Sequence, residues 1–270
     1  CACMAGAGMS VKAADKVAIN EKNFAPAVME YAQNADTNED GFLSSKEASK
    51  VKKMRFDTRQ YIDSFQGVKY FTGLKKFIYE VAEYQQDMTA APDLDLSGMD
   101  KLEKVTIYSE SMHIGTINLQ DCTNLQQLAL IPDSEHMIYV DGINLQGCTN
   151  LDSFICGGQT DQIDLSGLKK LEDVMFTGET ETLNLDRCSK LKNIYIISDT
   201  LKTLSLKGVR KLKGITVKAP SLESLDLSKN KKLKNVNCHY TQITSLDLSG
   251  NKDLKYLHCQ NNRKLTSLDV

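Results

Sequence analysis

The feature that most constrains this chain is an apolar pattern that recurs every 21 residues near its C-terminal end. Each copy reads L-x-x-L-x-L, with Ile, Val or Cys at some of the later positions, and the copies begin at Leu191, Leu212, Leu233 and Leu254. A shorter phrase alternates with it and places two aliphatic residues around one polar residue, as in 225–227 and 246–248. Repetition at a fixed period of about 20–50 residues is typical of solenoids, whose units bury their apolar faces against one another.

The spacing of the leucines identifies the unit as a leucine-rich repeat of about 20–26 residues. Traced back along the chain, the first leucine recurs at 74, 102, 125, 151, 171, 191, 212, 233 and 254, which gives about nine units over residues 61–270. Positions 1, 4 and 6 of each unit should face the interior, and positions 3, 5 and 7 should face outward. Units this short leave no room for a long helix, so the predicted fold is a strand-rich α/β leucine-rich-repeat solenoid.

A polar segment before the repeats, residues 36–47, matches the twelve-residue calcium loop of an EF-hand. Gly41 stands where that loop turns sharply, and the oxygen ligands would come from Asp36, Asn38, Asp40, Phe42 (through its carbonyl), Ser44 and Glu47. A second interpretation stays open, because Ser44-x-x-Glu47 is also a capping box that would begin a helix over 45–54. The segment therefore predicts either a structural Ca²⁺ site or a helix cap.

The chain divides into three parts on this interpretation. Residues 1–13 are small and apolar and resemble the end of a secretory signal, with a disordered tail or lipid attachment at Cys1 or Cys3 as alternatives. Residues 14–60 should form a small helical EF-hand-like cap, and residues 61–270 the repeats. No run of 18 apolar residues occurs, so no membrane span is predicted.

Taken together, these motifs resemble the secreted bacterial leucine-rich-repeat proteins, broadly the internalin-like ones. The resemblance covers residues 17–270 and rests on phrases of the Leu-Thr-Ser-Leu-Asp-Leu-Ser type at 225–228, 244–249 and 266–270. It implies export from a bacterium and an EF-hand-like helical cap before the repeats. One departure concerns the family's usual asparagine three residues after each strand, which survives only as Asn262, so less regular turns are expected.

Outward positions of the units carry an apolar and aromatic column that suits a protein interface. The candidate partner-binding residues are Ile131, Ile155, Met175, Tyr195, Ile197, Tyr240, Tyr256 and His258. Loops from the longer first units could instead cover this column, and the sequence does not separate the two interpretations.

Charge is distributed unevenly along the chain. Residues 187–270 carry 17 Lys and Arg against 6 Asp and Glu, a net charge of +11, whereas the remaining residues carry 16 against 29, or −13. Position 2 of four consecutive units is a lysine, and this lysine stripe consists of Lys192, Lys213, Lys234 and Lys255. Stacked like charges favour a polyanionic partner, although solvated surface lysines are the plainer interpretation.

The remaining reactive residues fit the repeat register. Cys156, Cys238 and Cys259 occupy inward position 6, and Cys122, Cys148 and Cys188 lie three residues before a first leucine, so packing is the plainer interpretation. The alternative is a disulfide between neighbouring units, Cys122 with Cys148 or Cys238 with Cys259, which a secreted setting would permit. Neither a nucleophile–base set nor a phosphate-binding glycine loop is evident, so no enzyme and no nucleic-acid partner is expected. The hypothesis is a secreted or cell-surface protein-binding or adhesion module; the alternative is a carbohydrate- or polyanion-binding protein that uses the lysine stripe.

Overall fold

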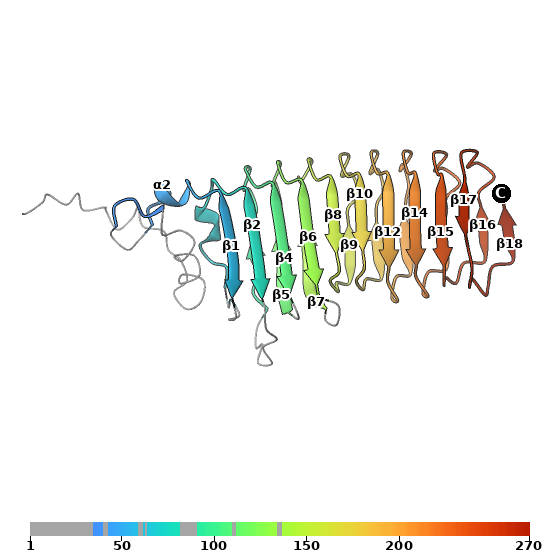
Figure 1. Cartoon of the computed structure of the whole chain (residues 1–270), viewed down its shortest axis with the longest axis horizontal. Helices are drawn as coiled ribbons and strands as arrows, with labels where there is room; N and C mark the ends of the chain where they lie inside the picture. Colours follow the sequence, from blue (N-terminus) through green and yellow to red (C-terminus); the bar gives the residue numbers. More distant parts are fainter. Residues whose placement is uncertain are drawn as a thin grey trace, which may run out of the picture.

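The computed structural model describes residues 35–39, 43–58, 62, 64–81, 91–109, 112–133 and 137–270. Over this part the chain winds into a parallel β-solenoid whose units stack in a long arm (Figure 1). Each unit contributes a strand to one continuous sheet, and most units contribute a second strand to the opposite wall. The predicted strand-rich solenoid of about nine turns is confirmed.

One wall is a ten-stranded parallel sheet in the order β1-β2-β4-β6-β8-β10-β12-β14-β15-β17. Its strands are β1 (Lys53–Thr58), β2 (Lys76–Val81), β4 (Lys104–Ser109), β6 (Gln127–Pro132), β8 (Ser153–Cys156), β10 (Asp173–Phe176), β12 (Asn193–Ile197), β14 (Gly214–Lys218), β15 (Asn235–His239) and β17 (Tyr256–His258). Every strand after β1 begins two residues after one of the nine predicted leucines. The leucine period therefore fixes where each strand starts.

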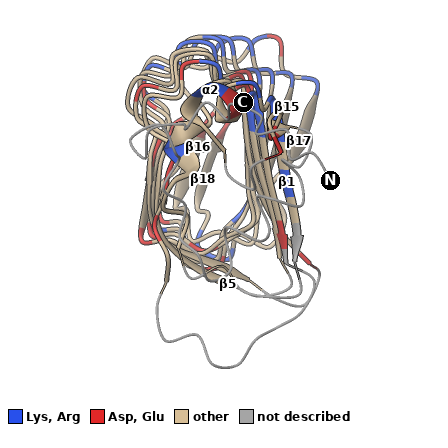
Figure 2. Ribbon diagram, turned by 90° about the vertical axis from the view of Figure 1, so that its left-hand side faces the viewer, with Lys and Arg blue, Asp and Glu red and all other residues tan. Residues whose placement is uncertain are grey.

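The opposite wall is built from the shorter alternating phrase and is broken into three small sheets. They contain β3 (Leu94–Asp95), β5 (Met112–Asn118) and β7 (Ile138–Asn144); β9 (Gln162–Asp164), β11 (Thr182–Asn184) and β13 (Thr203–Ser205); and β16 (Ser245–Asp247) with β18 (Ser267–Asp269). Figure 2 looks along the arm and shows the two walls joined by turns at the top and bottom.

The core fills the space between the walls with aliphatic side chains. In β12, for example, Ile194 and Ile196 are buried, whereas Tyr195 between them is 40% exposed. Each fully buried aliphatic side chain contributes about 1.5–3 kcal/mol relative to exposure. Near β1 and β2 the core becomes aromatic: the rings of Phe65 and Tyr79 meet edge to face at 5.2 Å, and the Tyr79 hydroxyl accepts a hydrogen bond from the Ile62 N–H.

The described residues do not confirm a helical cap over 14–60, most of whose N-terminal half lies outside them. They contain helix α2, which spans only Ser45–Ala48, and the 3₁₀ turn η3, which spans Val68–Tyr70. The predicted helix over 45–54 is wrong beyond Ala48, because β1 begins at Lys53 and pairs with β2 over six residues. Burial of Met54 and Phe56 in the core outweighs the helix start that the capping box provides. The sheet thus begins inside the range 14–60 that the sequence assigns to the cap, while residues 1–34 of the chain lie outside the described residues.

A buried polar column runs through the turns that precede the strands of the main sheet. The thiols of Cys122, Cys148 and Cys188 each donate to a carbonyl of the preceding unit at 3.1 Å. Asn230 and Asn251 occupy the same position in later units, and the Asn251 amide donates to the Leu227 carbonyl at 3.3 Å and to the Asn230 carbonyl at 2.8 Å. In the sequence, the position compared between units was the one three residues after each main-sheet strand, where the family usually has asparagine. That comparison missed this column, because here the column lies in the turn that precedes the strand.

The six cysteines among the described residues are free thiols. Burial raises the pKa of Cys156 and Cys238 to about 12 and that of Cys188 to about 11. These thiols are therefore protonated at neutral pH and pack as small apolar groups with a weak donor.

Replacing one member of the column tests its contribution. Asn251→Ala should lower the free energy of unfolding by about 1–3 kcal/mol, because it leaves buried carbonyls without a donor. Asn251→Cys should cost less, because a thiol already serves at this position in earlier units. Urea unfolding measures both, with Asn150→Ala on the surface as control; equal losses for the alanine and cysteine variants would contradict this role.

Candidate functional site

The outer face of the ten-stranded sheet presents three rows of side chains that run across the strands. The first row consists of Lys53, Lys76, Lys104, Gln127, Ser153, Asp173, Asn193, Gly214, Asn235 and Tyr256. The second row lies two residues further along each strand and consists of Arg55, Ile78, Thr106, Ala129, Ile155, Met175, Tyr195, Thr216, Asn237 and His258. A third, less complete row contains Tyr108, Ile131, Ile197, Lys218 and His239.

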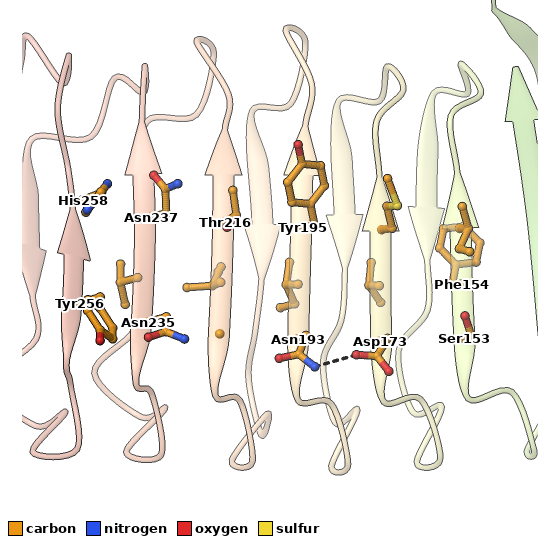
Figure 3. A pocket seen from close by; sticks show the side chains of 17 residues that line it. Ser153, Phe154, Asp173, Asn193, Tyr195, Thr216, Asn235, Asn237, Tyr256 and His258 are labelled. Carbon is orange, nitrogen blue, oxygen red and sulfur yellow. Dashed lines mark hydrogen bonds between the residues drawn. The ribbon is translucent and has the colours of Figure 1, made fainter. Parts of the chain in front are cut away.

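A groove of about 710 Å³ lies on this face between β8 and β17 (Figure 3). Its first row is polar, and the Asn193 amide donates to the Asp173 carboxylate at 2.7 Å. Gly214 interrupts this row because it has no side chain; a Cβ there would be in ordinary contact with the Asn193 side-chain oxygen, 3.4 Å away. Asn193 and Asn235 flank this gap in the row, and both offer amide donors and acceptors.

The second row gives the groove its apolar part. Ile155, Met175 and Tyr195 are directly opposite one another on β8, β10 and β12. Met175 is 44% exposed and Tyr195 is 40% exposed, so this surface faces solvent. Towards β17 the row becomes polar through Thr216, Asn237 and His258, and an apolar surface beside hydrogen-bonding groups results.

The structure brings five of the eight predicted partner-binding residues into the groove: Ile155, Met175, Tyr195, Tyr256 and His258. Ile131 and Ile197 instead lie half-buried in the third row. Tyr240 follows β15 in a left-handed conformation (φ 52°), with its ring 5.5 Å from that of His239 and 5.7 Å from the Lys218 ammonium.

Sequence reasoning missed the polar members of the groove. Asp173, Asn193 and Asn235 occupy position 3 of their units, a position that was assigned to the outer face but not compared between units. Reading that position down the repeats would have shown a polar row interrupted by Gly214. That comparison was the available signal.

The lysine stripe lies along the turns that enter the main sheet. Its backbones are linked in series: the N–H of Lys213 donates to the Lys192 carbonyl at 2.7 Å, and Lys234 and Lys255 continue the chain at 2.8 Å each. Lys192 forms an ion pair with Glu172, whose pKa is lowered by this contact first and by Lys190 and Lys211 as well. Figure 2 shows Lys and Arg side by side along the upper edge formed by these turns.

The predicted calcium loop is only partly described, because Asp40 and Phe42 lie outside the described residues. Within the described part, the Glu47 carboxylate accepts hydrogen bonds from the N–H and hydroxyl of Thr37 and from the N–H and hydroxyl of Ser44, at 2.7–2.9 Å. The Ser44 hydroxyl in turn accepts from the Glu47 N–H, which completes a capping box on α2. Among the described residues, no group of three His, Cys, Asp or Glu side chains is arranged to hold a metal ion.

The hydrogen bonds around Glu47 predict a pH dependence. Bonds from Ser44 and Thr37 lower the pKa of Glu47 from 4.5 to about 2, so its stabilising contribution is present above pH 4.5 and is lost as the pH falls toward 2. Glu47→Gln should cost about 2 kcal/mol at pH 7, and the difference from wild type should shrink across that pH range. Urea unfolding at several pH values measures it, with the exposed Glu223→Gln as control; a loss that is independent of pH would contradict the assignment.

Comparison with known proteins gives the following picture. No protein-family model matches the chain, and no curated protein matches it either. Among solved structures, the functional domain of InlJ from Listeria monocytogenes, which includes a cysteine ladder, is similar over 85% of this chain and 58% of that chain, with 14% identity and a TM-score of 0.41. The chain thus spans less than two thirds of that structure.

A second similar structure is the internalin InlF from Listeria monocytogenes. It covers 91% of this chain and 80% of that chain, with 16% identity and a TM-score of 0.44. None of the helices in the described part of the present chain has the length and apolar character of a membrane span.

Proposed function

We propose that this protein is a bacterial binding or adhesion module, exported to the cell surface or secreted, that holds a protein partner in the groove between β8 and β17. The observation that carries the proposal is the apolar row of half-buried Ile155 with exposed Met175 and Tyr195, which lies beside the polar row of Asp173, Asn193 and Asn235. Interfaces combine such an aromatic and methionine-containing centre with hydrogen-bonding groups around it.

The position of the groove on a continuous sheet favours this role. Each strand of the groove from β8 to β15 is paired on both sides, so little backbone conformational entropy is lost when a partner binds. Tyr195 lies near the centre of the groove, where tyrosines often dominate binding energy. The polar row offers donors and acceptors that fix the partner's orientation.

A second candidate function uses the lysine stripe to bind a polyanion such as an acidic polysaccharide. It is favoured by Lys213, Lys234 and Lys255, which stack on consecutive turns, whereas Lys192 is paired with Glu172. Exposed charges of this kind act over about 8–10 Å at physiological salt and weaken as salt is added. Salt dependence therefore separates the two candidates.

Binding variants test the groove directly. Immobilised protein is screened against arrays of extracellular proteins and polysaccharides, and each hit is measured again at low and high salt. Tyr195→Ala should weaken the binding of a protein partner held in the groove by at least about 2 kcal/mol, or roughly 30-fold in Kd, and this loss should depend little on salt. Tyr240→Ala, which removes an exposed tyrosine outside the groove, serves as the matched control.

The opposite pattern would support the polyanion candidate. In that case the triple substitution Lys213→Gln, Lys234→Gln and Lys255→Gln would abolish binding, and affinity would fall steeply with salt. Hits that respond to neither set of substitutions would count against both functions.

We also propose a structural calcium ion in the loop 36–47, which would order the cap. Support comes from the oxygen ligands at the expected positions of the sequence, with Glu47 as the closing ligand. Glu47 would exchange its hydrogen bonds from Thr37 and Ser44 for the ion. Calorimetric titration of chelator-treated protein with Ca²⁺ should show binding and a higher melting temperature, both lost in Asp36→Asn; no heat and no shift would reduce the segment to a helix cap.

A further inference from the structure

The N-terminal end of the outer face carries a second, separate row of lysines. Lys53, Lys76 and Lys104 lie opposite one another on β1, β2 and β4, in the first row, and are called the lysine row here. It is distinct from the lysine stripe, which lies in the turns of the last four units. The sequence did not predict the row, because β1 was expected to be helical.

The lysine row makes no ion pair with any described residue. The nearby carboxylates are already engaged: Glu80 pairs with Arg55 at 2.7 Å and Glu103 with Lys75 at 2.6 Å. Over residues 52–57, 75–80 and 103–108 there are six Lys and Arg against three Asp and Glu, a net charge of +3. This local positive surface lies within residues 1–186, the part of the chain whose net charge is negative.

Three like charges in register across strands destabilise the free protein, because directly opposite like charges repel. Binding of an anionic partner would remove that repulsion. The row also leads directly into the groove, since Gln127 and Ser153 continue it on β6 and β8. A partner seated in the groove can therefore extend over the lysines.

The spacing of the row indicates the kind of partner. Neighbouring strands are about 4.7–4.9 Å apart, so the outer lysines are separated by roughly 10 Å. On an α-helix, residues three and four apart are about 5–6 Å from one another, and seven residues span about 10.5 Å. In an extended chain, neighbouring residues on the same side are nearly 7 Å apart, so three of them span about 13 Å. This span matches the roughly 10 Å between the outer lysines less well than the helix does.

We infer that the lysine row binds the acidic face of an α-helix of the protein partner, with carboxylates at i, i+4 and i+7 and the helix axis lying across the strands. The inference rests on the proposed function, since it supplies the charge and shape of the partner that the groove holds.

The test uses a synthetic alanine-rich peptide of about 20 residues, long enough to be helical, with Glu at i, i+4 and i+7 on one face. Binding to ¹⁵N-labelled protein at low salt is followed by NMR, which detects weak complexes. Shifts should concentrate on the amides of β1, β2 and β4. The triple substitution Lys53→Gln, Lys76→Gln and Lys104→Gln should reduce affinity about tenfold, as expected for loss of three exposed ion pairs.

Two controls give the outcomes that overturn the inference. A peptide of the same composition with its Glu residues distributed around the helix should bind more weakly; equal binding would show that charge alone matters. The triple variant of the lysine stripe should bind the peptide as wild type does. Loss of binding in that variant would show that the peptide binds the lysine stripe and not the lysine row. Shifts absent at millimolar peptide would also refute the lysine row as a site.

Folding of the triple variant is checked by its melting temperature. At low salt it should melt at or above the wild-type temperature, because repulsion is removed, and the difference should vanish at high salt. A lower melting temperature would mean that the lysines are paired within the fold and would refute a free row. If the lysine-row inference fails, the proposed function of the groove still stands, since Tyr195→Ala tests the groove separately.

Discussion

Every surface of this protein depends on the parallel backbone pairing between neighbouring units. The pairing holds ten strands in one register from β1 to β17, so a side chain at one position of a unit lies beside the same position of the next. Local sequence differences are thereby converted into rows that cross the whole arm. Two such rows line the groove, and shorter segments of stacked positions form the lysine row and the lysine stripe, so none of these surfaces exists within a single unit.

Pairing alone leaves the turns between the walls with buried carbonyl groups, and the column of cysteine and asparagine side chains satisfies several of them. Thiols serve at Cys122, Cys148 and Cys188, whereas amides serve at Asn230 and Asn251. At the opposite turn Asn262 accepts from the Thr241 N–H and donates to the Cys238 carbonyl at 2.7 Å. The turns that orient the functional rows are therefore fixed by short polar bonds as well as by the apolar core.

Much of the fold could be predicted because the leucine period determines strand starts directly. β1 could not be predicted, since the capping box at Ser44 indicated a helix over 45–54, and only burial of Met54 and Phe56 in the core decides for a strand that pairs with β2. The apolar half of the groove was predicted from single outward residues such as Met175 and Tyr195. The polar row of the groove and its interruption at Gly214 depend on which residues are neighbours across units, and that information is absent from any one unit.

The buried thiols can also report where neighbouring units of the solenoid separate from one another. Cys122, Cys148, Cys188 and Cys238 lie in different units, and burial holds their pKa values at about 11–12. A thiol in this state reacts with an alkylating reagent only when its own unit separates from its neighbours. Because stability in a stacked array is a sum of local terms, the order in which these four thiols become reactive records where along the arm the stack comes apart first.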